Sequence, residues 1–527
     1  MLLILLTTLL LTYAIPTYRD ILTTNILTRL STICLIFSVV LLIYPHNSHV
    51  FFYSINLYNS YYHITPTSVL LSVLLLTLVS IIYPGYLTST YSYINNYNVK
   101  SHLLSIDNTE AYKYILFSLF SLVGSVLILQ CNDLLTLYLG IELQSFGVYI
   151  LACLYPNRNS INASMKYFLL GCLSSCIILL GIAFIYASLG LTRLDSLLSI
   201  TMYTELDVLS KTGYILIITG LLFKIGAAPL HHWAPDVYND SSTKTTIYLT
   251  SIPKISVLGL LMTLVVEYLP NYNTLSTLHS GNVLLLSATL SLILGSILGL
   301  TQSKIKRLLA YSTVSHIGFM LLSLPLCSYI SLESYLFYLI SYVLTNLNIF
   351  LILLTLGYLL KSRRKEDTLR EGHDIIFIKE LSGIYHKYPL LCLCLCLCLF
   401  SMAGIPPLIG FYGKQYVLSA LLDEQYYFLS LLAILTSLIS AGYYLKVVAI
   451  LFEHTEATAS TNINDVVNVV DTSVPLNVIN TQKVEHYINL TNSLAIILIS
   501  AIITLFSLKP SIILNSCTLI SLGLFSQ

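Results

Sequence analysis

Five ionisable side chains fall within stretches of sequence that are otherwise apolar. They are Glu142 in YLGIELQSF, Lys224 in LLFKIGAAPLHHW, Lys254 in SIPKISVLG, Lys414 in GFYGKQYVL and Lys446 in YYLKVVAIL. A charge at the centre of a bilayer costs on the order of 3 kcal/mol even on permissive insertion scales, so such groups are expected to face the protein interior. Their recurrence in one chain favours a route for protons or ions.

A lysine and a glutamate in such surroundings can form a proton switch, because burial disfavours the charged lysine whereas a nearby carboxylate stabilises it. We therefore hypothesise that Lys224 gains or loses a proton as Glu142 approaches or retreats. A buried ion pair with a structural role is the alternative. Lys254 and Lys446 lie nearer one end of their stretches, where a long side chain can also snorkel to the interface; for Lys446 this interpretation is equally good.

Three histidines and a second acid are further candidates. His316, in AYSTVSHIGFM, is suited to pass protons between the two halves of the chain, because imidazole titrates near pH 6.5 and both ring nitrogens take part; a packing histidine is the alternative. His231 and His232 are candidates for a hydrated proton entrance, and neighbours about 100° apart on a helix are poorly placed for joint metal binding. Glu267 is a candidate for an exit, or simply a solvated acid.

The composition shows what must position these groups. Of 527 residues, 56% are hydrophobic and 9% charged, and the mean hydropathy is +0.83. The expected fold is an all-α polytopic membrane protein of about 14 transmembrane helices, since a span needs about 20 apolar residues. The expected spans lie at residues 2–15, 26–44, 65–83, 113–130, 133–155, 165–189, 212–233, 246–268, 281–300, 305–324, 333–360, 388–421, 427–453 and 491–508. The stretch 511–525 is a candidate for an interfacial helix, so the expected number of spans lies between thirteen and fifteen.

Charge placement indicates an orientation for these spans. Most of the 25 Lys and Arg residues fall on alternate loops of one side, which puts both termini on the opposite, positive-poor side. Two polar stretches, 361–387 and 454–490, interrupt the positive-rich side. The second is expected to be a loop or a partner-binding segment, with a short hairpin as the alternative. The net charge of +1 offers no general attraction to nucleic acid.

The seventh and twelfth expected spans each carry a Gly/Pro interruption, at 226–229 and 404–410. Both are expected to be discontinuous helices, because proline removes a backbone donor and clashes with the preceding turn. Broken spans five apart suggest two inverted five-helix repeats. The expected domains are therefore helices 1–3 at 1–112, a first repeat (helices 4–8) at 113–268, a second (helices 9–13) at 281–453, a polar loop at 454–490 and a C-terminal helix and tail at 491–527.

Several kinds of chemistry lack a motif in this chain. There is no phosphate-binding glycine loop, no Walker lysine, no CxxC cluster and no haem motif. The four thiols of LCLCLCLCL, spaced by two, would step through about 200° around a helix, so we interpret them as apolar side chains and not as metal ligands. The chain alone is expected to perform no redox chemistry and to bind no cofactor.

Five motifs in order carry a resemblance to a known family. GIELQSFGVYIL, KYFLLGCLSSCIILLGIAFIY, LLFKIGAAPLHHWAPDVY, SKIKRLLAYSTVSHIGFM and AGIPPLIGFYGKQYVL resemble the antiporter-like, proton-translocating membrane subunits of respiratory complex I, over roughly residues 110 to 450. A lysine at 414, and not a glutamate, together with the run IELQSFGVYILACLY, is similar to the fungal mitochondrial branch of that family. The resemblance places the family's proton-transfer residues on Glu142, Lys224, Lys254 and Lys414.

This resemblance implies a function. Other subunits would pass electrons from NADH through FMN and iron–sulfur clusters to ubiquinone, and this chain would move protons from the matrix to the intermembrane space. Its location would be the mitochondrial inner membrane, and its partners other complex I membrane subunits and phospholipids. Two alternatives stay open: a stand-alone cation/proton antiporter, and a purely structural membrane subunit.

Overall fold

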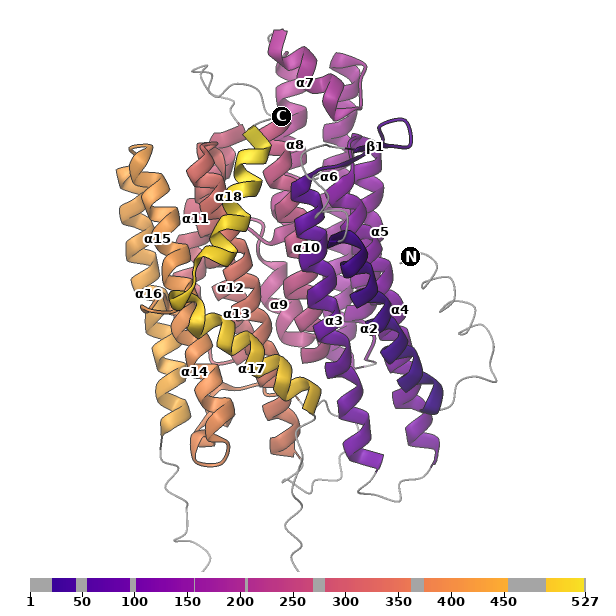
Figure 1. Cartoon of the computed structure of the whole chain (residues 1–527), viewed down its shortest axis with the longest axis vertical. Helices are drawn as coiled ribbons and strands as arrows, with labels where there is room; N and C mark the ends of the chain where they lie inside the picture. The colour runs from indigo at the N-terminus through magenta and orange to yellow at the C-terminus, as the bar shows by residue number, and fades with distance from the viewer. Residues whose placement is uncertain are drawn as a thin grey trace, which may run out of the picture.

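The computed structural model describes residues 21–43, 55–94, 101–155, 157–203, 207–268, 280–361, 374–453 and 490–525. Most of these residues form long helices that run roughly along one axis (Figure 1). The helices before the midpoint of the chain are α2 (Ile21–Ile43), α3 (Pro66–Ile94), α4 (Ser101–Gln130), α5 (Leu134–Ala152), α6 (Arg158–Leu189), α7 (Leu194–Tyr203), α8 (Val208–Ile225), α9 (Trp233–Asp240) and α10 (Thr243–Thr263), which continues as the π-helical turn η4 (Leu264–Tyr268).

The second half of the chain is also mainly helical. Its elements are α11 (Ser280–Leu300), α12 (Ile305–Ser323), η5 (Leu324–Leu326), α13 (Tyr329–Lys361), η6 (Ile378–Leu381), η7 (Ile384–His386), α14 (Pro389–Ala403), α15 (Ile409–Asp423), α16 (Tyr427–Phe452), α17 (Leu490–Leu505), η8 (Phe506–Leu508) and α18 (Ser511–Phe525). Within the described ranges, ten helices are long and apolar enough to cross a bilayer, or eleven if α17 and α18, bent by 79°, make one broken span. The chain is therefore a multi-pass helical membrane protein.

The expected spans and the observed helices differ in places. Span 2–15 and most of the loop 454–490 lie outside the described residues. The helix α2 covers most of the expected span 26–44, and α14 and α15, on either side of their break, together cover the expected span 388–421. The expected helix at 511–525 is present as α18.

Two elements correct the expectation of a purely helical chain with plain loops. Residues Ile55–Leu57 (β1) and Tyr62–Ile64 (β2) pair as a small antiparallel hairpin, with Ile55 opposite Ile64. The short helix α7 fills the connection between α6 and α8. Three-residue strands and a ten-residue helix are too short to stand out by periodicity against the apolar spans around them.

The two Gly/Pro interruptions break their helices as expected. The helix α8 ends at Ile225, where Gly226 takes the left-handed conformation (φ 83°), and α9 begins seven residues later at Trp233. The helix α14 ends at Ala403, where Gly404 has φ 88°, and α15 begins at Ile409. Left-handed backbone carries little penalty only for glycine, which explains the residue type at both ends.

Packing within each half uses close helix contacts. A Cβ atom at Gly124 on α4 would lie 2.5 Å from the backbone nitrogen of Gln144 on α5, and one at Gly181 on α6 would lie 2.7 Å from the carbonyl oxygen of Gly213 on α8. Small residues allow backbones to approach in this way inside a membrane. The long helix α13 lies near the centre and contacts α10, α12, α14, α15, α17 and α18.

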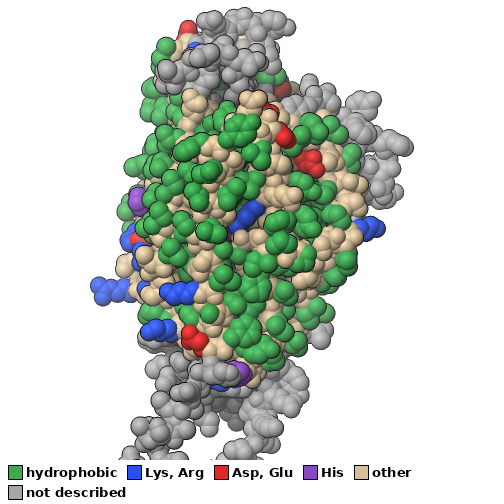
Figure 2. All heavy atoms as spheres, turned by 90° about the vertical axis from the view of Figure 1, so that its left-hand side faces the viewer, with side chains coloured by type: hydrophobic (Ala, Val, Ile, Leu, Met, Phe, Trp, Pro, Cys, Tyr) green, Lys and Arg blue, Asp and Glu red, His purple; other side chains and the backbone are tan. Residues whose placement is uncertain are grey.

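The outer surface is largely apolar. Figure 2 shows one side of the molecule, where hydrophobic side chains cover most of the surface and the visible Lys and Arg side chains gather mainly toward its lower part. Leu390 on α14 and Phe428 and Leu438 on α16 are more than 70% exposed. Exposed apolar area of this extent is suited to lipid or to neighbouring membrane subunits.

Candidate proton-transfer site

The first group of candidate residues lies between α5, α6 and α8. Lys224 is buried in the last turn of α8, and its Nζ donates to the hydroxyl of Tyr149 at 3.2 Å and to the carbonyl oxygen of Gly171 at 3.5 Å. No ion pair joins Glu142 to Lys224 among the described residues, and the Oε1 atom of Glu142 is buried without a hydrogen-bond partner in the described part of the chain. Tyr149 therefore occupies the place at Lys224 that a direct carboxylate contact would take.

The position of Tyr149 follows from helix geometry. Glu142, Ser145 and Tyr149 are spaced three and four residues apart on α5 and so share one face. The carboxylate, the serine hydroxyl and the phenol thus form a polar stripe that ends at Lys224. The expected pairing of Glu142 with Lys224 is realised as proximity with a tyrosine in contact with the lysine, and not as an ion pair.

The break after α8 is held by aromatic residues. Trp233, the first residue of α9, donates its indole N–H to the carbonyl oxygen of Phe223 at 2.9 Å, which also accepts from the backbone N–H of Gly226 at 3.0 Å. Its ring stacks on Tyr167 with centroids 4.6 Å apart, and Tyr167 meets Tyr149 edge to face at 4.8 Å. These contacts fix the end of α8 and with it the Lys224 side chain.

Lys254 lies on α10 and is almost fully buried. Its Nζ lies 5.3 Å from the centre of the Tyr238 ring of α9 and 5.8 Å from that of Tyr342 on α13, and it donates to the Tyr342 hydroxyl at 3.4 Å. Asn346 donates to the same hydroxyl at 3.3 Å. In the described part of the chain Lys254 thus has aromatic and hydroxyl partners, so cation–π attraction offsets part of the cost of burial.

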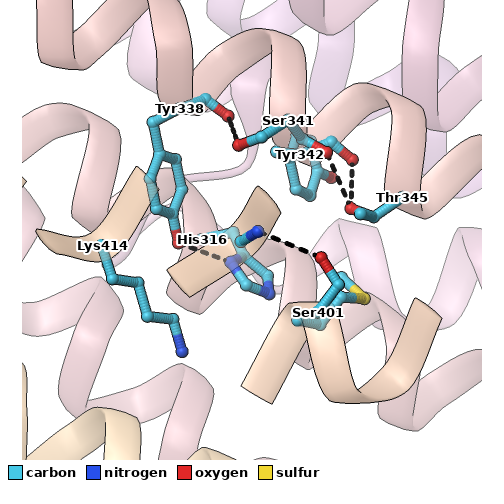
Figure 3. Close-up of a pocket in the computed structure, with 9 residues that line it drawn as sticks. His316, Tyr338, Ser341, Tyr342, Thr345, Ser401 and Lys414 are labelled. Atoms are coloured by element: carbon cyan, nitrogen blue, oxygen red, sulfur yellow. Dashed lines mark hydrogen bonds between the residues drawn. The ribbon is translucent and has the colours of Figure 1, made fainter. Parts of the chain in front are cut away.

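His316 lies on α12 between two tyrosines. Its Nδ1 is 2.7 Å from the hydroxyl of Tyr338 on α13, and its Nε2 is 3.1 Å from the hydroxyl of Tyr444 on α16. Figure 3 shows the Tyr338 hydroxyl directed at the imidazole. With one ring nitrogen as donor and the other as acceptor, a neutral imidazole can receive a proton on one side and release one on the other.

Lys414 lies one turn into α15, beside the break that precedes this helix. Its Nζ donates to the carbonyl oxygen of Ala403, the last residue of α14, at 3.0 Å and lies 5.5 Å from the centre of the Phe319 ring. A Cβ atom at Gly404 would lie 3.1 Å from Cδ of Lys414. Both broken helices therefore bring a buried lysine to their interruption, Lys224 before it and Lys414 after it.

A small cavity lies beside His316 and Lys414, the candidate residues of the second half of the chain. It is lined by His316, Tyr338, Tyr342 and Lys414, together with Ser341, Thr345, Ser401, Met402 and Gly410 (Figure 3). The centre of a water molecule can occupy about 10 Å³ of this cavity. This space is enough for about one water molecule, and the lining offers several polar partners for it.

The remaining candidates fall outside this line. Lys446 is exposed on α16, so the expectation that it faces the protein interior is wrong, whereas the snorkelling alternative stays a prediction. His232 is also exposed, whereas His231 is buried and its Nδ1 has no hydrogen-bond partner in the described residues. Glu267 lies in the turn η4, and its side chain is outside the described part.

Three tyrosines that contact the candidate residues were not predicted from the sequence. Tyr149, Tyr342 and Tyr338 each contact one of the candidate ionisable residues, yet the chain has 40 tyrosines, so the residue type alone does not mark these three. Their spacing to Glu142 on α5 and to each other on α13 was the available signal. Among the described residues no group of three or more His, Cys, Asp or Glu side chains is placed to hold a metal ion.

Comparison with known proteins gives a consistent family. The family described as "NADH:quinone oxidoreductase/Mrp antiporter, TM" matches residues 131–440. The NADH-ubiquinone oxidoreductase chain 2 of Rhizopus oryzae is 42% identical over 78% of both chains. The NADH-quinone oxidoreductase subunit N of Nitrosomonas europaea is 34% identical over 64% of this chain and 68% of its own length.

Solved structures share the fold. A chain of respiratory complex I from Thermus thermophilus has a TM-score of 0.72 at 23% identity, covering 98% of this chain and 97% of its own. A chain of the Mrp complex from a Dietzia species has the same TM-score at 17% identity, covering 99% and 96%. The matched region contains Glu142, Lys224, Lys254, His316 and Lys414, and the expected resemblance is confirmed. The chain belongs to the family of NADH:quinone oxidoreductase and Mrp antiporter membrane subunits.

Proposed function

We propose that this chain is the chain-2 type membrane subunit of a mitochondrial NADH:ubiquinone oxidoreductase and carries protons from the matrix to the intermembrane space. The observation that carries the proposal is a set of ionisable groups within the helices: the half-buried Glu142 and the buried Lys224 with Tyr149, Lys254 with Tyr342, then His316 and Lys414 around one cavity. Ionisable groups buried in membrane helices are costly and mark ion and proton pathways.

Two inverted repeats provide the frame. We assign the first to 113–268 and the second to 281–453, preceded by helices within 1–112 and followed by a polar loop at 454–490 and the C-terminal part at 491–527. Matching contacts support this division: α4 packs on α5 and α10 as α11 packs on α12 and α16, and α6 packs on α8 and α9 as α13 packs on α14 and α15. About 14 spans, including the first at 2–15, complete the proposed topology.

The orientation follows from the basic loops. The positive-rich ends, which include Lys304, Lys306 and Arg307, would face the matrix, with both termini on the intermembrane-space side. At a membrane potential of roughly 150 mV each proton costs about 3.5 kcal/mol electrically, so an open path would leak. The single-water cavity and the tyrosine contacts are suited to stepwise transfer instead.

Energy would come from other subunits. NADH, FMN, iron–sulfur clusters and ubiquinone would act elsewhere in the complex, and this chain would contact the neighbouring antiporter-like and small hydrophobic subunits and phospholipids through its apolar surface. Lys224 would be the first proton store, its charge set by Glu142. His231 and Glu267 would serve proton access on the two sides.

The test is proton translocation per NADH oxidised in vesicles that carry the complex with Lys224→Met. Lys211→Met, the same change at the start of the same helix, is the matched control. We expect both complexes to assemble on native gels and only Lys224→Met to lose coupled proton transfer. Normal pumping in an assembled Lys224→Met complex would refute the relay. Sodium-dependent transport without NADH oxidation would favour an antiporter.

A further inference from the structure

Tyr342 occupies a junction between the two halves of the proposed path. It lies on α13, is 3% exposed, and its hydroxyl accepts hydrogen bonds from Lys254 on α10 at 3.4 Å and from Asn346 at 3.3 Å. Both of these groups donate to the hydroxyl oxygen, and the side chain of Thr313 on α12 is a further hydrogen-bond partner of the same phenol. Tyr342 thus contacts Lys254, the lysine of the first proposed repeat, through its hydroxyl.

The same side chain also belongs to the second repeat. Tyr342 lines the cavity that holds His316 and Lys414, and its ring centre lies 5.5 Å from that of His316. Within the part of the chain that the structure describes, it contacts Lys254 and also lines this cavity, so it spans the gap between the two sets of charged residues. A water molecule in the cavity would be surrounded by side chains that include Tyr342, His316 and Lys414.

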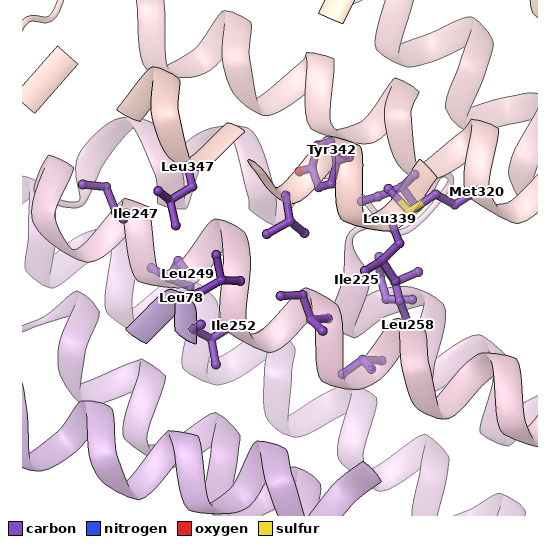
Figure 4. Close-up of a cluster of buried hydrophobic side chains, with 14 of the residues drawn as sticks. Leu78, Ile225, Ile247, Leu249, Ile252, Leu258, Met320, Leu339, Tyr342 and Leu347 are labelled. Carbon is purple, nitrogen blue, oxygen red and sulfur yellow. The ribbon is translucent and has the colours of Figure 1, made fainter. Parts of the chain in front are cut away.

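Many of the other neighbours of Tyr342 are apolar, with Thr313 on α12 as a polar exception. Figure 4 shows it at the edge of a cluster of buried aliphatic side chains that come from α3, α8, α10, α12 and α13, among them Ile225, Leu258, Met320 and Leu339. Packed aliphatic groups leave no polar partners for a chain of waters. Within the described residues, the Tyr342 hydroxyl is the polar group of α13 that contacts Lys254.

We propose that Tyr342 is the proton-transfer residue that connects Lys254 with the His316–Lys414 cavity. The ammonium of Lys254 transfers a proton to the phenol oxygen while the phenol O–H releases its own proton to the cavity water, which passes it to His316 or Lys414. At Lys254 one N–H bond breaks and the amine becomes neutral, while at the phenol one O–H bond forms and one breaks, so Tyr342 stays neutral. Rotation of the hydroxyl then restores the phenol, and Lys254 takes up another proton before the next transfer. This inference rests on the function proposed above.

The test compares two tyrosines of the same helix. Tyr342→Phe removes the hydroxyl and keeps the ring, whereas Tyr335→Phe removes a hydroxyl that donates to the carbonyl oxygen of Leu258 on α10, away from the cavity. We expect Tyr342→Phe to slow NADH-driven proton translocation per assembled complex by about 10²-fold, the usual contribution of a positioned proton-transfer group. Tyr335→Phe should retain wild-type translocation. Equal rates in the two variants would overturn the proposal.

A second pair of variants tests the cavity without touching the phenol. Ser341→Val places an extra methyl group at the cavity wall, whereas Ser334→Val makes the same change on α13 at a buried serine outside it. Loss of translocation and of its solvent isotope effect in Ser341→Val alone would support transfer through the cavity water. Lys254→Met distinguishes failure of the Tyr342 junction from failure of the proposed function. If it abolishes pumping while Tyr342→Phe and Ser341→Val do not, the junction fails but the proposed function stands; if none of the three affects pumping, both fail.

Discussion

The ion pair of Lys306 and Asp374 allows a test of what stabilises the start of α10, the helix that carries Lys254. Lys306 lies in the first turn of α12, and its Nζ donates to Asp374 and, at 2.9 Å, to the carbonyl oxygen of Ser241. The Asp374 carboxylate also accepts from the backbone N–H of Thr243 at 3.0 Å and from its hydroxyl at 2.6 Å. Asp374 therefore serves as an N-terminal cap of α10, the helix that carries Lys254.

The burial of the pair sets the magnitude. The side chains of Lys306 and Asp374 are 5% and 21% exposed, and breaking a buried pair by removal of one partner costs about 3–5 kcal/mol. Because Lys306 keeps its bond to Ser241, we take the lower value for Asp374→Ala, about 3 kcal/mol. At 1.4 kcal/mol per tenfold, this corresponds to a loss of about 10²-fold in protection of the first-turn amides of α10.

Hydrogen exchange of the solubilised complex, followed by mass spectrometry, measures this local opening. Asp374→Ala should lower protection at residues 243–248, and Lys306→Met/Asp374→Ala should recover part of it, because no unpaired charge remains. Protection within about threefold of wild type in Asp374→Ala would refute the reasoning, as would additive effects in the double variant.

Other predictions are more direct. Glu142→Gln should leave assembly on native gels intact, because its carboxylate makes no ion pair among the described residues, but should reduce coupled proton transfer. Lys446→Met should leave translocation in vesicles unchanged, since this lysine is exposed on α16. Asp236→Asn should alter hydrogen exchange of α9 by only about 0–1 kcal/mol, because its ion pairs with Lys166 and Arg307 are solvent-exposed and screened by salt. Burial raises the pKa of Asp374, but the Lys306 charge and the Thr243 hydrogen bonds outweigh this and hold it below its ordinary value. Its stabilisation should persist above about pH 4 and be lost as the pH falls through the lowered folded pKa, in the same exchange experiment.

Much of this protein follows from its sequence alone. Composition and the length of the apolar runs require a polytopic helical membrane protein, since the bilayer fixes both the length and the type of its spans. The breaks at Gly226 and Gly404 were predictable because glycine and proline act on the backbone locally. Lys224, Lys254, His316 and Lys414 were identifiable because a charged or polar group is conspicuous in an apolar span.

Tertiary structure decided the rest. Whether Lys446 is buried depends on which face of α16 meets a neighbour, and a nearly uniformly apolar helix carries no periodicity that marks its buried face. The absence of an ion pair between Glu142 and Lys224, and the places of Tyr149, Tyr338 and Tyr342, depend on contacts between helices far apart in the chain. One tyrosine among 40 becomes a candidate proton carrier only because folding brings its hydroxyl to Lys254 and makes its side chain part of the cavity wall.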